Sequence, residues 1–572
     1  MIAQEHSLVA LAEAHGAKLD EERRGRLADL EGLGGDGAVE ALLACPGVNE
    51  ESLLRALAAQ LEIPWWPEAV LNVARDAMTK VPAALAVRHQ VVPLGLEGRT
   101  LVLGIYNLYD MQARQQLGRT LTEPFRLVAS TRTRIHDAIQ QGYGIGAETL
   151  DAILAGRAQE DVFDQFKEES SQLDDSGNDE ASVITFVNRI FREAIAEGAT
   201  DIHVEPLEDG LRIRFRRDGM LHEIPVPANI KALQESVIAR LKIMARLDIA
   251  ERRLPQDGRI NLEAAGLHID VRVATIPTVT GETVSLRLLS GSKYSLDSIG
   301  AGESEQKVLQ ELISVPNGII LVTGPTGSGK STTLYTLLSC LNQPGRRIVT
   351  IEDPVENKIA GINQIAVRSE IGLTFAVGLR SILRADPNIV MVGEMRDAET
   401  AETAIRAALT GHLVFSTLHT NDAVSSIGRL TDMGIEPFLV AASVRAFIAQ
   451  RLVRRLCPEC RVPVDYSDVQ MRSLGMDPGT KHHFFKAAGC PACRNSGYAG
   501  RLAIMEICRM TPALQELVAN RATNADLQRQ ALEDGMKPLR LDGLFKAMDG
   551  RTSLEEIQRV TATDKPAAAP SK

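Results

Sequence analysis

The sequence predicts an α/β fold with three or more domains, the largest of which contains a parallel β-sheet. The apolar run Gly318–Thr323 is followed directly by a glycine-rich loop and then by leucines at helical spacing in residues 331–341. Two further apolar runs, residues 348–351 and 389–392, each end in acidic residues. Short apolar runs of this kind are typical of strands buried on both faces of a sheet. The chain has 572 residues, more than one ordinary hydrophobic core covers, so additional domains are expected.

The composition favours a cytoplasmic protein whose main partner is not a nucleic acid. Lys and Arg number 63 against 74 Asp and Glu, and the resulting net charge of −11 attracts neither DNA nor an anionic membrane surface. The sequence has no run of roughly 18 apolar residues, and its start lacks the basic and apolar regions of a secretory signal. Any membrane association is therefore expected to pass through a partner protein.

The order of patterns along the chain predicts six segments. Residues 159–182 are acidic and poor in aliphatic side chains, so they cannot bury enough apolar surface to offset their ordering entropy and predict a flexible linker. Helices are expected near residues 51–62 and at 183–195. A strand-like stretch at 91–105 is broken by the turn Glu97-Gly98, and further strands are expected at 211–216 and 268–274. The predicted segments are an N-terminal domain (1–150), an acidic linker (151–182), an α+β domain (183–300), a nucleotide-binding domain (301–450), a cysteine-bearing insert (451–500) and a helical region with a disordered tail (501–572).

The run GPTGSGKST at residues 324–332 predicts a site for nucleotide phosphates. Its glycines let backbone N–H groups approach phosphate without clashing Cβ atoms, and the N-terminus of the following helix adds partial positive charge. Lys330 can reach the β- and γ-phosphates of ATP, and the Ser331 hydroxyl can ligate Mg²⁺. The alternative, a glycine-rich turn that merely matches the pattern, is disfavoured because a strand and a helix both flank the loop. The candidate nucleotide-binding residues are Gly324, Pro325, Thr326, Gly327, Ser328, Gly329, Lys330, Ser331 and Thr332.

Two acidic clusters follow predicted strands downstream of this loop. Glu352, Asp353 and Glu356 follow the run 348–351, and Glu394 follows the run 389–392. In α/β sheets ligands bind beyond the carboxyl ends of the strands, and hydrolysis needs carboxylates that position water and hold the metal. A solvated acid that caps the next helix remains the alternative for either cluster taken alone. Two such strands after one phosphate loop favour catalysis.

Four of the seven cysteines form a C-x2-C…C-x2-C pattern. Cys457 and Cys460 are separated by 29 residues from Cys490 and Cys493. Each pair can turn two thiolates toward one ion, and four sulfurs complete a tetrahedral Zn²⁺ site without an open position. We therefore expect a structural zinc site, with a redox or iron–sulfur site as the alternative.

Together these motifs resemble the secretion ATPase superfamily that powers type II secretion and type IV pili. The resemblance rests on the segments GPTGSGKSTT, TIEDPVE, DPNIVMVGEMRD and TGHLVFSTLHTND, in family order, and covers about residues 182–560. It implies a RecA-like P-loop ATPase domain, a preceding PAS-like domain and an N-terminal docking domain. It also implies a hexameric ring that docks to the cytoplasmic domain of an inner-membrane platform protein, which would hold the chain at that membrane.

The resemblance also implies roles for single residues. Glu356 would activate water, Glu394 would act on the Mg²⁺ shell, and His412 and His419 would sense or position the γ-phosphate. Without the surrounding motif, each histidine alone would be interpreted as a structural residue with satisfied hydrogen bonds. The last candidate catalytic residues are Arg259 and Arg272 of the preceding domain, whose guanidinium groups would stabilise transition-state charge on phosphate. The alternative for both is an interdomain salt bridge without a catalytic role.

Details of the motifs favour type II secretion over pilus assembly. The segments RSILRADPN and RLTDMGIEP look more like the secretion branch, and retraction motors usually lack the cysteine insert. Some relatives bind cyclic di-GMP through an Arg-Leu-Gly type motif. Residues 30–35 depart from that motif, so this ligand is not predicted. A pilus-assembly ATPase, a DNA-handling RecA-like motor and a non-enzymatic nucleotide-gated scaffold remain as alternatives.

Overall fold

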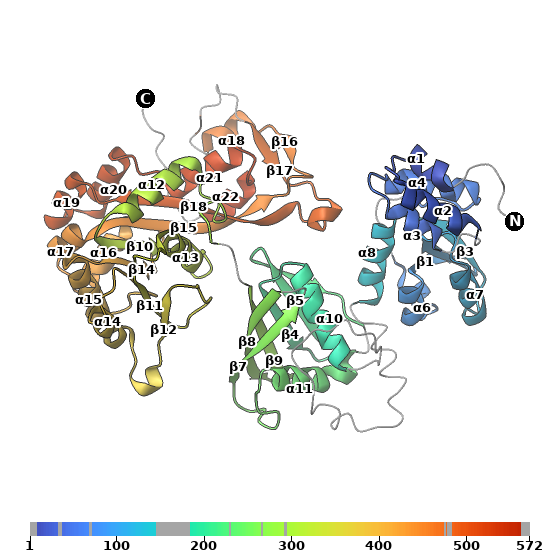
Figure 1. The fold of residues 1–572 in the computed structure, drawn as a ribbon, viewed down its shortest axis with the longest axis horizontal. Helices are drawn as coiled ribbons and strands as arrows, with labels where there is room; N and C mark the ends of the chain where they lie inside the picture. The colour runs from blue at the N-terminus through green and yellow to red at the C-terminus, as the bar shows by residue number, and fades with distance from the viewer. Residues whose placement is uncertain are drawn as a thin grey trace. The chain divides into compact units, whose positions relative to one another are not determined.

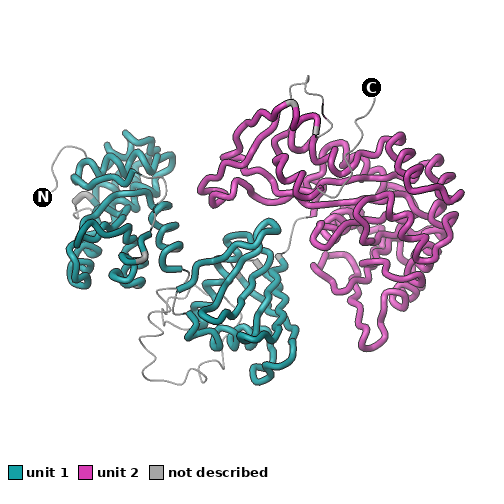
Figure 2. Tube along the Cα trace, turned by 180° about the vertical axis from the view of Figure 1, so that it is seen from behind, with its two compact units in different colours: residues 1–289 teal, residues 290–572 magenta. Residues whose placement is uncertain are grey.

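The computed structural model describes residues 8–32, 37–67, 71, 73–144, 183–227, 230–264, 267–290, 294–473, 476 and 483–561. These residues form two compact units, 1–289 and 290–572 (Figure 2). The predicted linker at residues 151–182 and the predicted disordered tail lie outside the described residues. The finer division into six segments stays a prediction.

The first part of unit 1 is a small α/β body. The predicted helix near residues 51–62 is confirmed as α4, whose first turn is capped by the Asn49 side chain accepting the N–H of Ser52 at 3.0 Å. The predicted strand pair is confirmed as the antiparallel hairpin β1–β2, and β3 adds to it in parallel. The elements are α1 (Leu8–Ala14), α2 (Glu21–Gly32), α3 (Ala38–Leu43), α4 (Glu50–Gln60), α5 (Arg75–Met78), α6 (Ala83–Arg88), β1 (Val91–Glu97), β2 (Thr100–Ile105), α7 (Met111–Thr120), β3 (Phe125–Ala129) and α8 (Arg132–Tyr143).

The second part of unit 1 is a six-stranded sheet with the order β6-β5-β4-β9-β8-β7 (Figure 1). Helices α10 and α11 share one apolar core with it, because α10 turns Phe186, Ile190 and Phe191 to the same side. The predicted helix and both predicted strands are confirmed. The elements are α10 (Val183–Ala196), β4 (Asp201–Pro206), β5 (Leu211–Arg217), β6 (Met220–Ile224), η2 (Ile230–Leu233), α11 (Gln234–Met244), β7 (Gln256–Ala264), β8 (Leu267–Thr278) and β9 (Gly281–Ser290).

Unit 2 is built on a seven-stranded sheet with the order β12-β11-β13-β14-β10-β15-β18. All neighbours run parallel except β15 and β18, which form a long antiparallel pair. The central strands are buried along their whole length because helices cover both faces. The strands are β10 (Gly318–Thr323), β11 (Ile348–Glu352), β12 (Asn363–Ala366), β13 (Ile389–Val392), β14 (Leu413–Leu418), β15 (Val444–Leu456) and β18 (Tyr498–Arg509).

The remaining elements of unit 2 surround this sheet. Between β15 and β18, the short strands β16 and β17 pair antiparallel, with α18 between them in the chain. Helices α19, α20, α21 and α22 follow β18 (Figure 1). The elements of unit 2 outside the large sheet are α12 (Glu303–Ser314), α13 (Lys330–Leu341), η3 (Ser369–Ile371), α14 (Phe375–Leu383), α15 (Ala398–Leu409), α16 (Ser425–Asp432), α17 (Pro437–Ser443), β16 (Val462–Val464), α18 (Asp468–Ser473), β17 (Phe484–Lys486), η4 (Pro491–Cys493), α19 (Pro512–Ala519), α20 (Asn524–Glu533), α21 (Leu539–Met548) and α22 (Leu554–Thr561).

The register of the parallel strands decides which loops meet. Thr323 of β10 lies beside Leu418 of β14, and Ile351 of β11 lies beside Val392 of β13. The glycine-rich loop and the residues that follow β11, β13 and β14 therefore leave the sheet at one edge. Within the part of the chain described here, no helix is long and apolar enough to cross a bilayer.

Candidate active site and metal centre

The glycine-rich loop joins β10 to α13 in a backbone conformation that only glycine adopts readily. Gly324 has φ 145°, and a Cβ on it would lie 2.5 Å from the carbonyl oxygen of Gln450 and 2.7 Å from the hydroxyl of Ser328. Gly329 has φ 86°, and its Cβ would lie 2.8 Å from Nε2 of Gln450. The loop is thus pressed against β15 on one side and leaves its backbone N–H groups for a ligand on the other.

Lys330 begins helix α13 and folds back over the loop. Its Nζ donates to the carbonyl oxygens of Gly324 at 2.8 Å and Pro325 at 3.2 Å. Burial lowers the pKa of Lys330 below its usual value, and the carboxylates of Glu394 and Glu356 offset only part of that shift. Both acids therefore lie within electrostatic reach of the ammonium. Ser331 and Thr332 follow in the first turn of α13, half-buried and exposed respectively.

Glu394 and His419 come together beside this lysine. Gly393 extends the ladder of β13 because its N–H donates to the Ile351 carbonyl at 2.8 Å, and Glu394 is the next residue. Only 14% of the Glu394 side chain is exposed, and its two oxygens face Nη2 of Arg396 at 2.5 Å and Nε2 of His419 at 3.4 Å. A carboxylate and an imidazole thus share the edge of the sheet that carries the glycine-rich loop.

The position of His419 is fixed by the residue after it. The N–H of Thr420 donates to the hydroxyl of Thr323 at 2.9 Å, and the two threonine hydroxyls lie 2.6 Å apart. Because Thr323 is the last residue of β10, the histidine is tied directly to the start of the glycine-rich loop.

His412 lies at the opposite edge of the sheet. It precedes β14, its carbonyl accepts the N–H of Gly318 at 3.1 Å, and its Nδ1 faces the carbonyl of Ala407 at 2.9 Å. Gly318 and Leu413 are register partners at the amino ends of their strands, roughly 20 Å from the loop at the carboxyl end. His412 therefore lies away from the glycine-rich loop of its own chain, and its role in sensing or positioning the γ-phosphate stays a prediction.

The first acidic cluster divides into a buried and an exposed part. Glu352 is 4% exposed and accepts hydrogen bonds from Thr350 at 2.6 Å, Gln364 at 3.0 Å and the hydroxyl of Tyr335. Three of the roughly four acceptor sites of this buried carboxylate are occupied by protein donors, so its contacts are structural. Asp353 and Glu356 lie beyond the strand and are exposed.

Tyr335 connects these two parts and was not identified from the sequence. Its hydroxyl donates to Glu352 and accepts the backbone N–H of Glu356 at 3.2 Å. Burial and the adjacent Glu352 carboxylate raise the pKa of Tyr335, so the hydroxyl keeps its proton. The side chain thus holds the Glu356 loop against α13. The only sequence signal was a polar aromatic group inside a helix that is otherwise buried.

The two arginines lie in the other compact unit. Arg259 of β7 and Arg272 of β8 are direct register partners, so their side chains leave the same face of the sheet. Nη1 of Arg259 lies 3.7 Å from Oδ2 of Asp270. Their action on nucleotide stays a prediction.

The four predicted cysteines gather into one cluster between β15 and β18. The Sγ atoms of Cys457 and Cys490 lie 3.8 Å apart, and Cys493 lies 3.7 Å from both Cys460 and Cys490. A tetrahedron with metal–sulfur bonds of about 2.3 Å has sulfur–sulfur edges of about 3.8 Å. A disulfide would need about 2.05 Å. The cluster therefore has the geometry of a tetrahedral metal site.

Backbone N–H groups prepare the cluster for a cation. Burial raises the pKa of Cys493, but hydrogen bonds from the N–H groups of Cys490 and Gly497, each 3.2 Å from Sγ, and from the Cys490 and Cys460 side chains together lower it to about 7. The thiolate is the form that binds metals.

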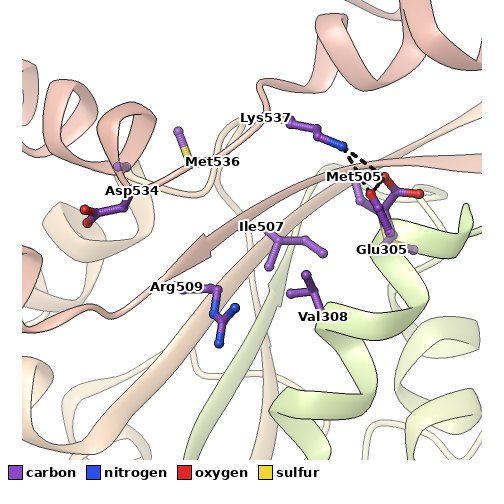
Figure 3. Close-up of a pocket in the computed structure, with 11 residues that line it drawn as sticks. Glu305, Val308, Met505, Ile507, Arg509, Asp534, Met536 and Lys537 are labelled. Atoms are coloured by element: carbon purple, nitrogen blue, oxygen red, sulfur yellow. Dashed lines mark hydrogen bonds and ion pairs between the residues drawn. The ribbon is translucent and has the colours of Figure 1, made fainter.

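A separate cavity of about 140 Å³ lies beside the edge strand β18 (Figure 3). Its walls come from α12, β18 and the turn after α20. Lys537 lies 3.9 Å from the Glu305 carboxylate at its rim, and Arg509 lies 3.1 Å from Glu311. Because these charges neutralise one another in pairs, the cavity does not compete with the glycine-rich loop as the candidate active site.

Comparison with known proteins identifies the family. The family described as "Type II/IV secretion system protein" matches residues 176–559. This range includes the glycine-rich loop, the residues that follow β11, β13 and β14, and the four clustered cysteines. This chain belongs to the type II/IV secretion system protein family. A second family, the MshEN domain, matches residues 61–149. As a member of this family, the chain is an ATP-hydrolysing enzyme.

Several curated relatives of this secretion-family chain match over most of its length. It is 43% identical over 533 residues to the type IV pilus assembly ATPase PilB of Myxococcus xanthus, covering 92% of this chain and 94% of that protein. It is 42% identical over 502 residues to the type II secretion system ATPase E of Vibrio cholerae, covering 86% and 99%. The ATPase DotB of Legionella pneumophila, a solved structure at 20% identity, shares the fold with a TM-score of 0.50, covering 66% of this chain and 96% of that one.

Replacing Tyr335 by Phe should lower turnover roughly tenfold and leave nucleotide affinity within about twofold. The change removes one hydroxyl and leaves an oxygen of the buried Glu352 without its donor, a loss of about 1–3 kcal/mol that falls on the Glu356 loop. Steady-state phosphate release and the Kd for Mg-ADP measure the two effects. Thr336→Val on the same helix is the control, since its hydroxyl only returns to the Thr332 carbonyl. Equal loss of turnover in both variants would contradict the assignment.

Proposed function

We propose that this chain is the ATPase motor of a type II secretion system, where ATP hydrolysis drives pseudopilus assembly and protein export. The observation that carries the proposal is the shared edge of the sheet, where the loop with Lys330 follows β10, Glu394 follows β13 and His419 follows β14, with His419 Nε2 3.4 Å from Glu394. The match to nearly the whole Vibrio cholerae ATPase E supports the secretion assignment. Type IV pilus assembly is the second candidate, because the Myxococcus xanthus relative matches 92% of this chain.

In this proposal each group at the sheet edge has one task. The loop N–H groups and Lys330 would hold the β- and γ-phosphates, and Ser331 would ligate Mg²⁺. Glu394 would act on the water shell of Mg²⁺, and His419 would sense or position the γ-phosphate. The Glu356 carboxylate orients and deprotonates the attacking water. Its backbone is held by Tyr335 while its side chain remains exposed to incoming water.

The cysteine cluster is proposed to bind Zn²⁺ as a structural ion. Four sulfurs at tetrahedral spacing suit Zn²⁺ and leave no coordination position for a substrate. The N–H bonds to Cys493 favour its thiolate form. Bound there, the ion would hold the ends of β15 and β18 together.

The proposed assembly is a hexameric ring on the cytoplasmic side of the inner membrane. The platform protein of the secretion system would hold it there through its cytoplasmic domain. Within the ring, the guanidinium groups of the exposed Arg259 and the half-buried Arg272 would stabilise transition-state charge on phosphate. Nucleic acid has no place in this proposal, since the net charge of the chain is −11.

Glu356→Gln should keep Mg-ATP binding within about twofold and reduce phosphate release by at least a hundredfold. The amide keeps the size of the side chain but cannot accept a proton from water, and general-base catalysis typically contributes about 10²–10⁴ in rate. The control is Glu370→Gln, an exposed acid on η3 that should turn over normally. Undiminished turnover in the Glu356 variant would remove this residue as the base.

Metal analysis of the purified chain should give one zinc per polypeptide, and Cys460→Ser should lose it. A tetrahedral thiolate site that loses one sulfur binds zinc far more weakly, and the ends of β15 and β18 lose their cross-link. Elemental analysis measures the content, and thermal unfolding with and without a chelator measures the stabilisation. Cys340→Ser, outside the cluster, is the control. Iron in place of zinc, or full zinc in the Cys460 variant, would contradict the assignment.

Deleting the gene in its native host separates the two candidate systems. We expect exported proteins to disappear from the medium while surface pili remain, and the intact gene to restore export. A copy with Lys330→Ala should not restore it, because the phosphate-binding ammonium is missing. Loss of pili with export intact would assign the chain to pilus assembly instead.

A further inference from the structure

Gln450 is a buried amide placed between β15 and the glycine-rich loop. It is 1% exposed and lies in the middle of β15, the strand next to β10. Its Nε2 donates to the carbonyl oxygen of Ser328 at 2.9 Å, and its Oε1 accepts the hydroxyl of Thr333 at 2.6 Å. One side chain thus binds both the loop and the first turn of α13. A fully buried amide that is satisfied at both ends has its orientation fixed.

The bond to Ser328 controls the direction of a different group. The carbonyl of Ser328 and the N–H of Gly329 belong to the same peptide unit, which is planar and trans, so they point in opposite directions. Because Gln450 holds the carbonyl toward β15, the N–H of Gly329 is turned away from β15. That direction is the open side of the loop, where the phosphates of a nucleotide bind.

Because residue 329 is a glycine, the loop needs the restraint that the Gln450–Ser328 hydrogen bond supplies. Gly329 has φ 86° and no Cβ to restrict rotation of the peptide before it. A Cβ there would lie 2.8 Å from the Gln450 amide, so the loop backbone lies directly against that side chain. The freedom that lets the loop approach phosphate also lets the peptide turn over, and Gln450 supplies the restraint.

We propose that Gln450 is a positioning residue for nucleotide binding, which keeps the N–H of Gly329 directed at the β-phosphate. It acts through the loop and does not touch the nucleotide. The ligands it affects are those with a β-phosphate: ATP, ADP and inorganic pyrophosphate. The proposal rests on the ATP-hydrolysing activity of the chain and is independent of whether the motor serves secretion or pilus assembly.

The test compares two buried substitutions of matched size in the full-length protein. Gln450→Met keeps the length of the side chain and removes both bonds, whereas Thr333→Val keeps its volume and removes only the bond on the helix side. Displacement of a fluorescent ADP analogue gives affinities for ADP, pyrophosphate and AMP. We expect Gln450→Met to weaken ADP and pyrophosphate roughly tenfold and AMP less than twofold. Thr333→Val should stay within about threefold for all three.

Kinetics supply a second readout that a purely structural role would not give. In Gln450→Met the KM for ATP should rise about tenfold while kcat at saturating ATP stays within about threefold, because nucleotide binding restores the loop geometry. Gln450→Asn, which withdraws the amide by one methylene, replaces the Met variant if that variant does not fold. Unchanged ADP affinity, or equal weakening of AMP and ADP, would overturn the proposal. Loss of export in cells with normal nucleotide affinity would instead concern the proposed function.

Discussion

The parallel register of β10, β11, β13 and β14 is the constraint on which the candidate site depends. Parallel neighbours end at one edge although they are far apart in the sequence: Thr323 pairs with Leu418, and Val392 pairs with Ser416 and Ile351. The strand pairing brings together the groups that follow them, and His419 Nε2 then lies 3.4 Å from the Glu394 carboxylate. The local bonds to Tyr335, Thr323 and Gln450 then fix the final orientations.

The sequence predicted the parts of this arrangement that depend on local pattern. Continuous apolar runs identified the buried strands, glycine spacing identified the phosphate loop, and the two C-x2-C pairs identified the cluster whose Sγ atoms lie within 4.8 Å of one another. Each of these signals is local in sequence, because burial on both faces and positive φ act on neighbouring residues, and each C-x2-C pair is a short motif of its own. The acid after β13 belongs to the same class, since strand direction alone fixes its edge.

The parts that the sequence could not place depend on pairing between distant strands. His412 and His419 stand seven residues apart in one motif and read alike, yet a parallel strand separates them and sends them to opposite edges. Tyr335 and Gln450 carry no recognisable signal, because their value lies in which buried acceptor or donor the fold brings to them. Their partners, Glu352 and Ser328, lie 17 and 122 residues away. Polar side chains inside a packed core become interpretable only when those long-range neighbours are known.

The long antiparallel pair of β15 and β18 has a consequence for how the insert can vary. The chain leaves this ribbon at Cys457 and returns at Gly497, where the Cys457 N–H donates to the Gly497 carbonyl at 3.0 Å beside the sulfur cluster. This hydrogen bond therefore closes the segment between the two strands at the point where it leaves the sheet. Insertions and deletions within this segment, beyond the Cys457–Gly497 hydrogen bond, therefore need not shift the register of β15 and β18. Homologous motors can vary the segment while the sheet edge with the candidate active site stays unchanged.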